Sequence, residues 1–219
     1  MRLEAGERGF LPRRHLWMAA GLAALVLVTR LPFATRLLYS WDSVNFAEGM
    51  RGLDIARHAP HPPGYPYYVA LARAVDAVVG DPNASLVLVS IVFAALAVVA
   101  TYGYGRMAFD EATGIVAALS LAGSLTFWAY GTVALSYTVL AFFSTIVALA
   151  AHLRVFQPNR VALWQMTLLY SVAGGFRPDL LLFLAPLWLL CLLRATWQER
   201  VLSATLAGIG FAAWFVPTA

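Results

Sequence analysis

Long apolar blocks joined by short polar connections dominate this chain. Seven blocks approach the length of a membrane span: residues 15–33, 85–104, 113–129, 133–152, 161–173, 180–193 and 201–216. A helix needs about 20 apolar residues to cross the hydrocarbon of a bilayer. Within lipid, the backbone groups of a span must be hydrogen-bonded inside the segment, which favours helices. The pattern therefore predicts an all-α polytopic membrane protein of about seven transmembrane helices, forming one domain over residues 1–219.

One polar segment, residues 36–65, interrupts this pattern. It holds three carboxylates and two of the four histidines: Asp42, Glu48, Asp54, His58 and His61. The following stretch, residues 65–79, is amphipathic and carries Arg73 and Asp76. A stretch that short and that charged is more typical of a helix lying in the membrane interface than of a span. We therefore expect a reaction that uses water-exposed polar side chains to take place in this first loop.

The distribution of arginines indicates an orientation. If residues 65–79 do not cross the membrane, most arginines of the short connections fall on the side of the N-terminus: Arg106, Arg154, Arg160, Arg194 and Arg200. Only Arg177 then lies on the other side beyond the first loop. Because positive charge marks the cytoplasmic side, we expect residues 1–14 to lie in the cytoplasm. An extracytoplasmic loop with interfacial helices then spans residues 34–83, and a helical bundle spans residues 84–217.

The composition agrees with a membrane protein and argues against a soluble globular domain and a nucleic-acid-binding protein. Hydrophobic residues make up 61% of the chain, charged residues 12%, and the mean hydropathy is +0.74. A soluble domain carries about a quarter charged residues. The net charge of +4 comes from scattered arginines without any lysine, so it does not indicate nucleic-acid binding. The one cysteine, Cys191, lies in an apolar run, so we expect its side chain to pack in the core as a small hydrophobic residue.

Asp42 is the first candidate for chemistry. Ser40 or Ser43 could cap a helix that continues to about Arg57. Asp42 would then lie at the N-terminus of this helix, where a carboxylate interacts favourably with the helix dipole. A purely structural capping role for Asp42 is the alternative.

Glu48 and Asp54 lie further along the same predicted helix. Glu48 is three residues from Arg51, and Asp54 is three residues from both Arg51 and Arg57. At this spacing the side chains can form solvated ion pairs. For Glu48 the ion pair is the preferred interpretation.

The segment from His58 to Tyr68 reads HAPHPPGYPYY. Its four prolines exclude a regular helix and favour an extended, preset backbone. Such a segment can hold His61 and Tyr65 in fixed places. His58 and His61 with a carboxylate could form a metal site, but a hydrogen-bonding or phosphate-contacting histidine is the preferred interpretation.

Arg177 lies in the turn Gly174-Gly175-Phe176-Arg177-Pro178-Asp179, on the same predicted membrane face as Asp42. A charge this close to hydrocarbon is costly unless it is matched or used. The guanidinium fork suits a phosphate group, whereas an Arg–Asp pair that closes the helix turn is the alternative. Tyr137, at the outer start of another span, would alone be an interfacial aromatic anchor.

These features together resemble the GT-C membrane glycosyltransferases, and most closely their protein O-mannosyltransferase-like branch. The likeness rests on an N-terminal span, a loop that opens with Asp42-Ser43, and the HPPGYP stretch at residues 61–66. It extends over residues 16–217. The remaining spans are generic, and the acidic neighbours that relatives often carry are replaced here by Val44-Asn45 and by Ser136 beside Tyr137.

The resemblance implies transfer of a sugar from a polyprenyl-phosphate carrier to an acceptor hydroxyl, with inversion, on the outer face of a bacterial cytoplasmic membrane. Asp42 would be the general base, and Arg177 and His61 would hold the lipid phosphate. Tyr65 and Tyr137 would contact substrate, and Glu48 or Asp54 could replace the missing acidic residues. The lipid-linked sugar is a substrate, no cofactor is implied, and metal dependence stays open.

The partners implied are the membrane lipid carrier and a protein or glycan acceptor, without nucleic acid. Members of this group are usually longer and have more spans, so we expect a truncated product or a half-enzyme completed by a partner chain. A non-catalytic subunit that binds the lipid carrier or assists assembly is the second hypothesis. A small transporter is a weaker third, because the predicted spans carry few charges away from their ends.

Overall fold

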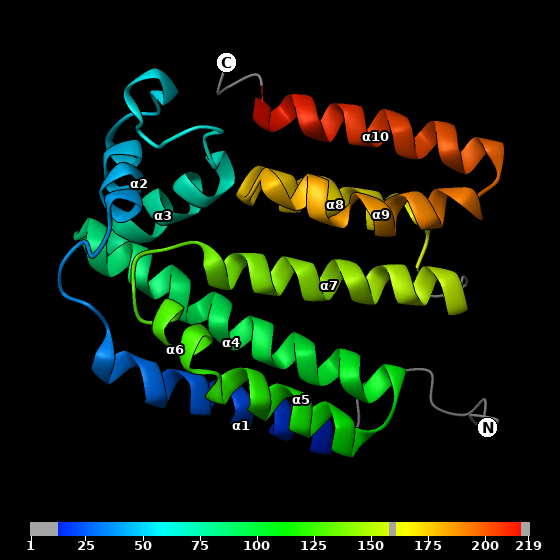
Figure 1. The fold of residues 1–219 in the computed structure, drawn as a ribbon, viewed down its shortest axis with the longest axis horizontal. Helices are drawn as coiled ribbons and strands as arrows, with labels where there is room; N and C mark the ends of the chain where they lie inside the picture. The colour runs from blue at the N-terminus through cyan, green and yellow to red at the C-terminus, as the bar shows by residue number, and fades with distance from the viewer. Residues whose placement is uncertain (1–12, 158–160, 216–219) are drawn as a thin grey trace.

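The computed structural model describes residues 13–157 and 161–215, and every regular element within them is helical. The helices are α1 (Arg13–Arg30), α2 (Trp41–Arg51), α3 (Pro66–Val79), α4 (Pro82–Ala108), α5 (Glu111–Gly123), α6 (Leu125–Tyr130), α7 (Tyr137–Phe156), α8 (Leu163–Phe176), α9 (Asp179–Leu193) and α10 (Trp197–Phe215), with 3-10 turns η1 (Leu31–Phe33) and η2 (Ile55–Arg57). The predicted all-α class is confirmed for this part of the chain. The long helices run back and forth between two ends of a bundle, and α2 and α3 lie at one end (Figure 1).

Among the described residues, three helical segments are long and apolar enough to cross a membrane: Arg13–Phe33, Pro82–Ala108 and Tyr137–Phe156. Helices α5 and α9 are apolar but shorter. The expected number of seven spans therefore stays a prediction. Residue 216 of the final expected span, residue 217 of the expected bundle and residues 1–12 of the segment expected to be cytoplasmic lie outside the described part of the chain.

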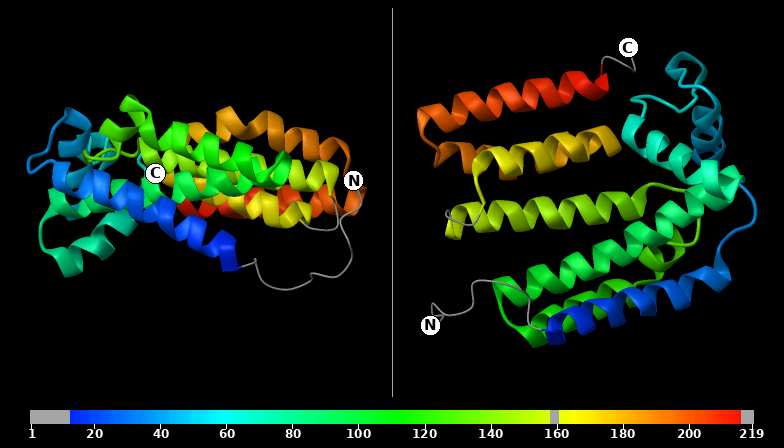
Figure 2. Two further views of the ribbon diagram at one scale, coloured as in Figure 1. Left: turned by 90° about the horizontal axis from the view of Figure 1, so that it is seen from below. Right: turned by 180° about the vertical axis from the view of Figure 1, so that it is seen from behind.

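Helix α4 is the centre of the bundle. Seen from behind, α10, α8, α7, α4 and α1 lie side by side in that order (Figure 2). The first half of α4, around Leu86 to Phe93, packs in one hydrophobic core with α2, α3, α7, α8 and α9. Its second half, around Ala94 to Tyr102, packs in another core with α1, α5 and α6. The two cores therefore share one helix.

Two glycines let α4 and α5 approach closely. A Cβ on Gly105 would lie 2.8 Å from Gly114 Cα, and a Cβ on Gly114 would lie 2.7 Å from the Tyr102 carbonyl oxygen. Small residues at such crossings allow backbones to touch, which favours helix association within lipid. Asp110 caps α5 by accepting a hydrogen bond from Thr113 N at 2.7 Å. This bond is the main reason why the pKa of Asp110 is lowered.

The stretch 113–129, expected as one span, is broken at Ser124, which ends α5 and caps α6. Arg30 lies at this break and is only 1% exposed. Its Nη2 donates to the Ala122 carbonyl at 2.9 Å, and its guanidinium lies 5.7 Å from the Phe127 ring centroid. Because the last carbonyls of a helix have no partner within the helix, Arg30 stabilises the end of α5 and joins it to α1.

Helix α2 ends at Arg51 rather than near Arg57, and η2 follows after a short gap. Arg73 of α3 accounts for this end, because its Nε and Nη2 donate to the carbonyls of Met50 and Gly49, each at 2.7 Å. A cation at a helix C-terminus also interacts favourably with the helix dipole. The predicted helix to about Arg57 was therefore too long.

Most arginines of the connections gather at the end of the bundle opposite α2 and α3, as the sequence predicted: Arg106 in α4, Arg154 in α7, Arg194 after α9 and Arg200 in α10. Arg160 lies outside the described residues. Ion pairs Arg14–Glu111 at 3.0 Å and Arg154–Glu199 at 2.8 Å join helices at this end. Which end faces the cytoplasm stays a prediction.

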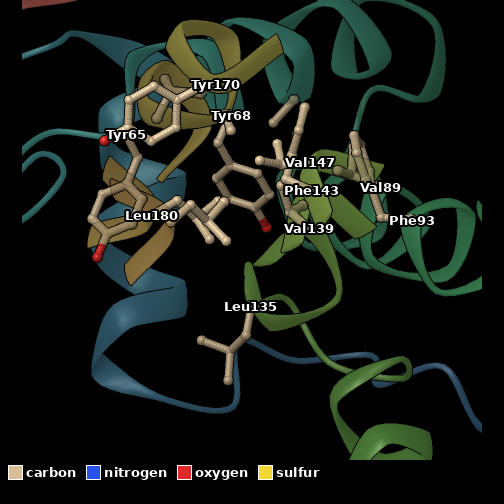
Figure 3. Packing of buried hydrophobic residues seen from close by; sticks show 14 of the residues in the cluster. Tyr65, Tyr68, Val89, Phe93, Leu135, Val139, Phe143, Val147, Tyr170 and Leu180 are labelled. Carbon is tan, nitrogen blue, oxygen red and sulfur yellow. The ribbon is translucent and has the colours of Figure 1, made fainter. Parts of the chain in front are cut away.

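The side chain of Tyr68 packs α3 against the larger core. Its ring is fully buried among side chains of α7 and α9, including Val139 and Leu180 (Figure 3). Proline at the first helical position suits the start of α3 at Pro66, since the missing N–H is not needed there. The helix expected over residues 65–79 is confirmed over Pro66–Val79, so the expected exclusion of helix by proline holds only as far as Tyr65. Helix α3 fixes the proline-rich segment to the bundle.

Gly49 fixes the other side of that segment. A Cβ at this position would lie 2.8 Å from Pro60 Cδ and 2.9 Å from Pro60 N. Only glycine therefore lets α2 pack directly on the backbone of residues 59–60. The segment is held between α2 and α3.

We predict that Gly49→Val lowers the free energy of unfolding by about 1–3 kcal/mol, the usual cost of overpacking. The added atoms meet backbone, which cannot move aside as a flexible side chain could. Gly52→Val is the matched control, because Gly52 has extended backbone and nothing within 4 Å of an added Cβ. Thermal unfolding in detergent would compare them, and equal losses would contradict the packing role of Gly49.

Candidate active site

Asp42 and His61 meet at the outer edge of the α2–α3 end. Ser40 caps α2 by accepting a hydrogen bond from Ser43 N at 3.2 Å, which places Asp42 in the first turn. Asp42 Oδ1 lies 3.8 Å from His61 Nδ1, with side chains 47% and 21% exposed, respectively. This distance is too long for a hydrogen bond. The cap belongs to Ser40, so Asp42 keeps its carboxylate free for another partner.

Aromatic packing holds the His61 ring in place. The ring centroids of His61 and Tyr65 lie 5.0 Å apart, and Phe46 of α2 lies 5.4 Å from His61 and 5.2 Å from Tyr65. His61 Nδ1 is buried and has no hydrogen-bond partner. A buried ring nitrogen without a partner is costly, so this atom is suited to receive a bound group.

Tyr65 joins the proline-rich segment to the rest of the cluster. Its backbone is in the left-handed region with φ of 48°, which is uncommon for a residue with a side chain. Burial raises the pKa of the Tyr65 hydroxyl, and the nearby Arg177 cation opposes that shift. Strained backbone of this kind persists where surrounding contacts require it, and here it directs Tyr65 toward Arg177.

Arg177 is the buried cation of the cluster, only 7% exposed. Its Nε and Nη2 donate to the two carboxylate oxygens of Asp179 at 3.1 and 2.7 Å, and its Nη1 donates to Ser136 Oγ at 3.0 Å. Its guanidinium carbon lies 5.7 Å from the Tyr65 ring centroid and 5.1 Å from that of Tyr137. Arg177 is thus paired at its edge and covered by aromatic rings.

Gly175 brings the Arg177 turn against α3. A Cβ on Gly175 would lie 2.3 Å from the Tyr67 ring, so only glycine permits this contact. Tyr67 also packs edge-on against Phe176, with ring centroids 6.0 Å apart. The turn between α8 and α9 therefore rests directly on the start of α3.

The structure brings together five of the seven predicted site residues: Asp42, His61, Tyr65, Arg177 and Tyr137. The other two form local ion pairs, Glu48 with Arg51 at 2.9 Å and Asp54 with Arg57 at 3.4 Å. Asp54 also caps η2. No hydrogen bond or ion pair in the described residues joins either carboxylate to the cluster.

His58 does not join a metal-binding group. Within residues 13–157 and 161–215, no three histidine, cysteine or carboxylate side chains lie close enough to hold a metal ion. His58 itself ends η2 in the left-handed conformation with φ of 59°. The arrangement found instead is a half-exposed carboxylate and a histidine linked through tyrosine to a buried arginine.

Sequence reasoning missed Ser136 and Phe46 as members of the site. Ser136 was considered only as a neighbour of Tyr137, and Phe46 was not singled out. An apolar residue four positions after Asp42 lies on the same helix face as Asp42, which is the one signal that could have indicated Phe46. Nothing local to Ser136 indicates its bond with Arg177, which lies 41 residues further along the chain.

Comparison with known families supports the resemblance in part. A family model described as dolichyl-phosphate-mannose-protein mannosyltransferase matches residues 60–218, which is most of the chain. The match includes the proline-rich segment from Pro60 and the turn with Arg177, and it begins after Asp42. No curated protein and no solved structure matches the chain.

We predict that Asp179→Asn lowers the free energy of unfolding by about 1–3 kcal/mol, because it leaves the Arg177 cation buried without its counter-ion. Adding Arg177→Gln to this variant should recover part of the loss. Glu48→Gln is the control, since it breaks an exposed ion pair that contributes about 0–1 kcal/mol. Chemical unfolding in detergent measures all three, and equal losses in the two single variants would refute the distinction.

Proposed function

The chain belongs to the dolichyl-phosphate-mannose-protein mannosyltransferase family, and from this premise we propose that it transfers a hexosyl group from a polyprenyl-phosphate carrier to an acceptor hydroxyl. Family membership makes it an integral membrane glycosyltransferase. The finer proposal is carried by one observation, the contact cluster that runs from Asp42 through His61 and Tyr65 to Arg177. The reaction takes place at the extracytoplasmic membrane face.

Asp42 acts as the general base in this proposal. Its carboxylate takes the proton of the acceptor hydroxyl while the hydroxyl oxygen attacks the anomeric carbon of the sugar. The bond from that carbon to the phosphate oxygen breaks, and the phosphate leaves with the bonding electron pair. Attack from the face opposite the leaving group inverts the anomeric configuration, as in inverting glycosidases.

His61 positions the acceptor. Asp42 Oδ1 and His61 Nδ1 lie 3.8 Å apart, so an acceptor hydroxyl that bridged them would lie within hydrogen-bond distance of both atoms. Such a hydroxyl would also give the buried His61 Nδ1 the partner that it lacks. The rings of Phe46 and Tyr65 hold this nitrogen in place.

Arg177 stabilises the leaving phosphate. A guanidinium carries five N–H donors, and Asp179 and Ser136 use one from each nitrogen. One N–H on Nη1 and one on Nη2 therefore remain for phosphate oxygens. Hydrogen bonds to a developing negative charge are a main source of transition-state stabilisation. Tyr137, which is 39% exposed, forms the accessible wall beside this cation.

Glu48 and Asp54 are proposed contacts of the acceptor rather than of the donor. Both side chains are at the exposed surface, Glu48 in α2 and Asp54 before η2, and their partners Arg51 and Arg57 are more exposed still. An exposed carboxylate can exchange such a partner for a hydroxyl or amide of the acceptor at little cost.

A second candidate is a non-catalytic subunit that binds the lipid carrier. The observation in its favour is that Arg177 is already paired with Asp179, which reduces its ability to stabilise the negative charge that develops on a leaving phosphate during transfer. A binding subunit would take up the lipid donor without transferring its sugar. The two functions therefore differ in whether transfer accompanies binding.

We predict that Asp42→Asn lowers the rate of sugar transfer about 10²–10⁴-fold, the usual contribution of a general base, while binding of the polyprenyl-phosphate donor persists. Asp81→Asn is the matched control, because Asp81 caps α4 at the same end of the bundle and asparagine caps equally well. Single-turnover transfer in membranes and donor binding would both be measured. Unchanged transfer in Asp42→Asn would remove Asp42 from this role, and binding without transfer by the wild type would favour the second candidate.

We also predict that the glycosidic bond of the product has the anomeric configuration opposite to that of the donor. A single displacement at the anomeric carbon requires this outcome. Proton NMR of the product, with the sugar–phosphate bond of the donor as reference, measures it. Retention would require a covalent intermediate and would exclude Asp42 as a simple base.

A further inference from the structure

Two grooves open at the α2–α3 end of the bundle, on either side of the connection that follows η1. The α6 groove, with a volume of about 540 Å³, is lined by Leu125, Thr126, Ala129 and Tyr130 of α6 together with Thr35 and Leu135. The α4 groove, of about 500 Å³, is lined by the start of α4, including Asn83, Ala84 and Leu88. Both have the size of ordinary ligand sites.

Thr35 is the wall between the grooves. Its N donates to the Thr132 carbonyl at 2.9 Å, and its own carbonyl accepts from Asn83 Nδ2 at 2.7 Å. These two bonds tie the connection to the turn before α7 on one side and to α4 on the other. Each groove therefore has a fixed inner edge.

Only the α6 groove connects to the candidate active site. Tyr130 on its wall stacks on Tyr137, with ring centroids 4.3 Å apart, and the guanidinium of Arg177 lies 5.1 Å from the same Tyr137 ring. Leu135, also on its wall, precedes Ser136, whose hydroxyl accepts a hydrogen bond from Arg177. The groove thus ends one side-chain layer from the buried cation.

We propose that the α6 groove holds the first isoprenoid units of the polyprenyl-phosphate donor, with the phosphate directed toward Arg177. This inference rests on the proposed function and adds where the lipid part of the donor binds. The contacts from Tyr130 through Tyr137 join the apolar α6 groove to the Arg177 cation. A lipid phosphate matches this arrangement, because it has an apolar chain and an anionic end. Helix α6 packs against α5 and α7, and α7 is long and apolar enough to cross a membrane, so a chain in the groove can continue along α7 into the bilayer.

The lining of the two grooves favours this assignment. Along the α6 groove the walls are apolar or hydroxyl-bearing, and no charged residue lines it. Arg36 and Asp81 line the α4 groove, and Asn83 Oδ1 is buried there without a partner. A hydrocarbon chain is favoured where it displaces water from apolar surface and disfavoured where it would desolvate charges.

Ala129→Trp tests the groove, because Ala129 is an exposed helical alanine on its wall and tryptophan would fill the space. Ala84→Trp is the matched control, an exposed helical alanine on the α4 groove. Binding of undecaprenyl phosphate to the detergent-solubilised full chain is compared with binding of methyl phosphate, which has no isoprenoid units. We expect Ala129→Trp to weaken the binding of undecaprenyl phosphate about tenfold, a loss of buried methylene contacts, and to leave the binding of methyl phosphate nearly unchanged.

Ala84→Trp should change neither affinity, and both variants should show the melting temperature of the wild type. A photoreactive diazirine on the second isoprene unit of the wild-type ligand supplies an independent measurement, and its cross-links should map to residues 125–130. Equal binding of undecaprenyl phosphate by wild type and Ala129→Trp, a loss confined to Ala84→Trp, or cross-links on α4 alone would overturn the inference.

Competition separates this occupant from ordinary membrane lipid. Phosphatidylglycerol should not displace undecaprenyl phosphate at equal concentration, and equal displacement would make the groove a general lipid site and overturn the inference. Failure of the wild type to bind undecaprenyl phosphate would refute the proposed function itself, and the inference with it. If Ala129→Trp did not weaken the binding of undecaprenyl phosphate while Asp42→Asn still lowered the rate of transfer, the inference alone would be refuted.

Discussion

The buried Arg177 cation determines how the α2–α3 end of the molecule is built. A guanidinium removed from water must be matched by acceptors nearby, and here the acceptors come from two different turns, Asp179 beside it and Ser136 before α7. Its faces are covered by Tyr65 and Tyr137. Three segments far apart in the sequence are therefore tied to one charge, and the proline-rich segment acquires its fixed position through that tie.

The two charged groups of the site have opposite environments. Arg177 is buried and held by several bonds, whereas Asp42 is half exposed at the start of a helix. A preorganised cation is worth more where water is excluded, and an accessible carboxylate suits a substrate that arrives from water. The order of these environments, from solvent to interior, matches a reaction in which a soluble acceptor meets a donor held in lipid.

Much of this arrangement could be predicted from the sequence. The apolar blocks located the long helices, because hydrophobic patterning is a local signal. The candidate site was predicted from the family resemblance of Asp42-Ser43 and the proline-rich segment, and its role stays a prediction. The break at Ser124 could not be predicted, since it depends on Arg30 meeting the last carbonyls of α5. The end of α2 depends on Arg73 in the same way. The bond between Ser136 and Arg177 is a tertiary contact that no periodicity encodes.

The sharing of α4 between two cores has a consequence for how the chain can be divided. One half of α4 completes the core under the candidate site, and the other half completes the core with α1, α5 and α6. A fragment that kept only the site end would expose the apolar face of α4 that the second core covers. The two ends of the described bundle are therefore coupled through α4, and a cut that removes either core leaves part of this helix uncovered.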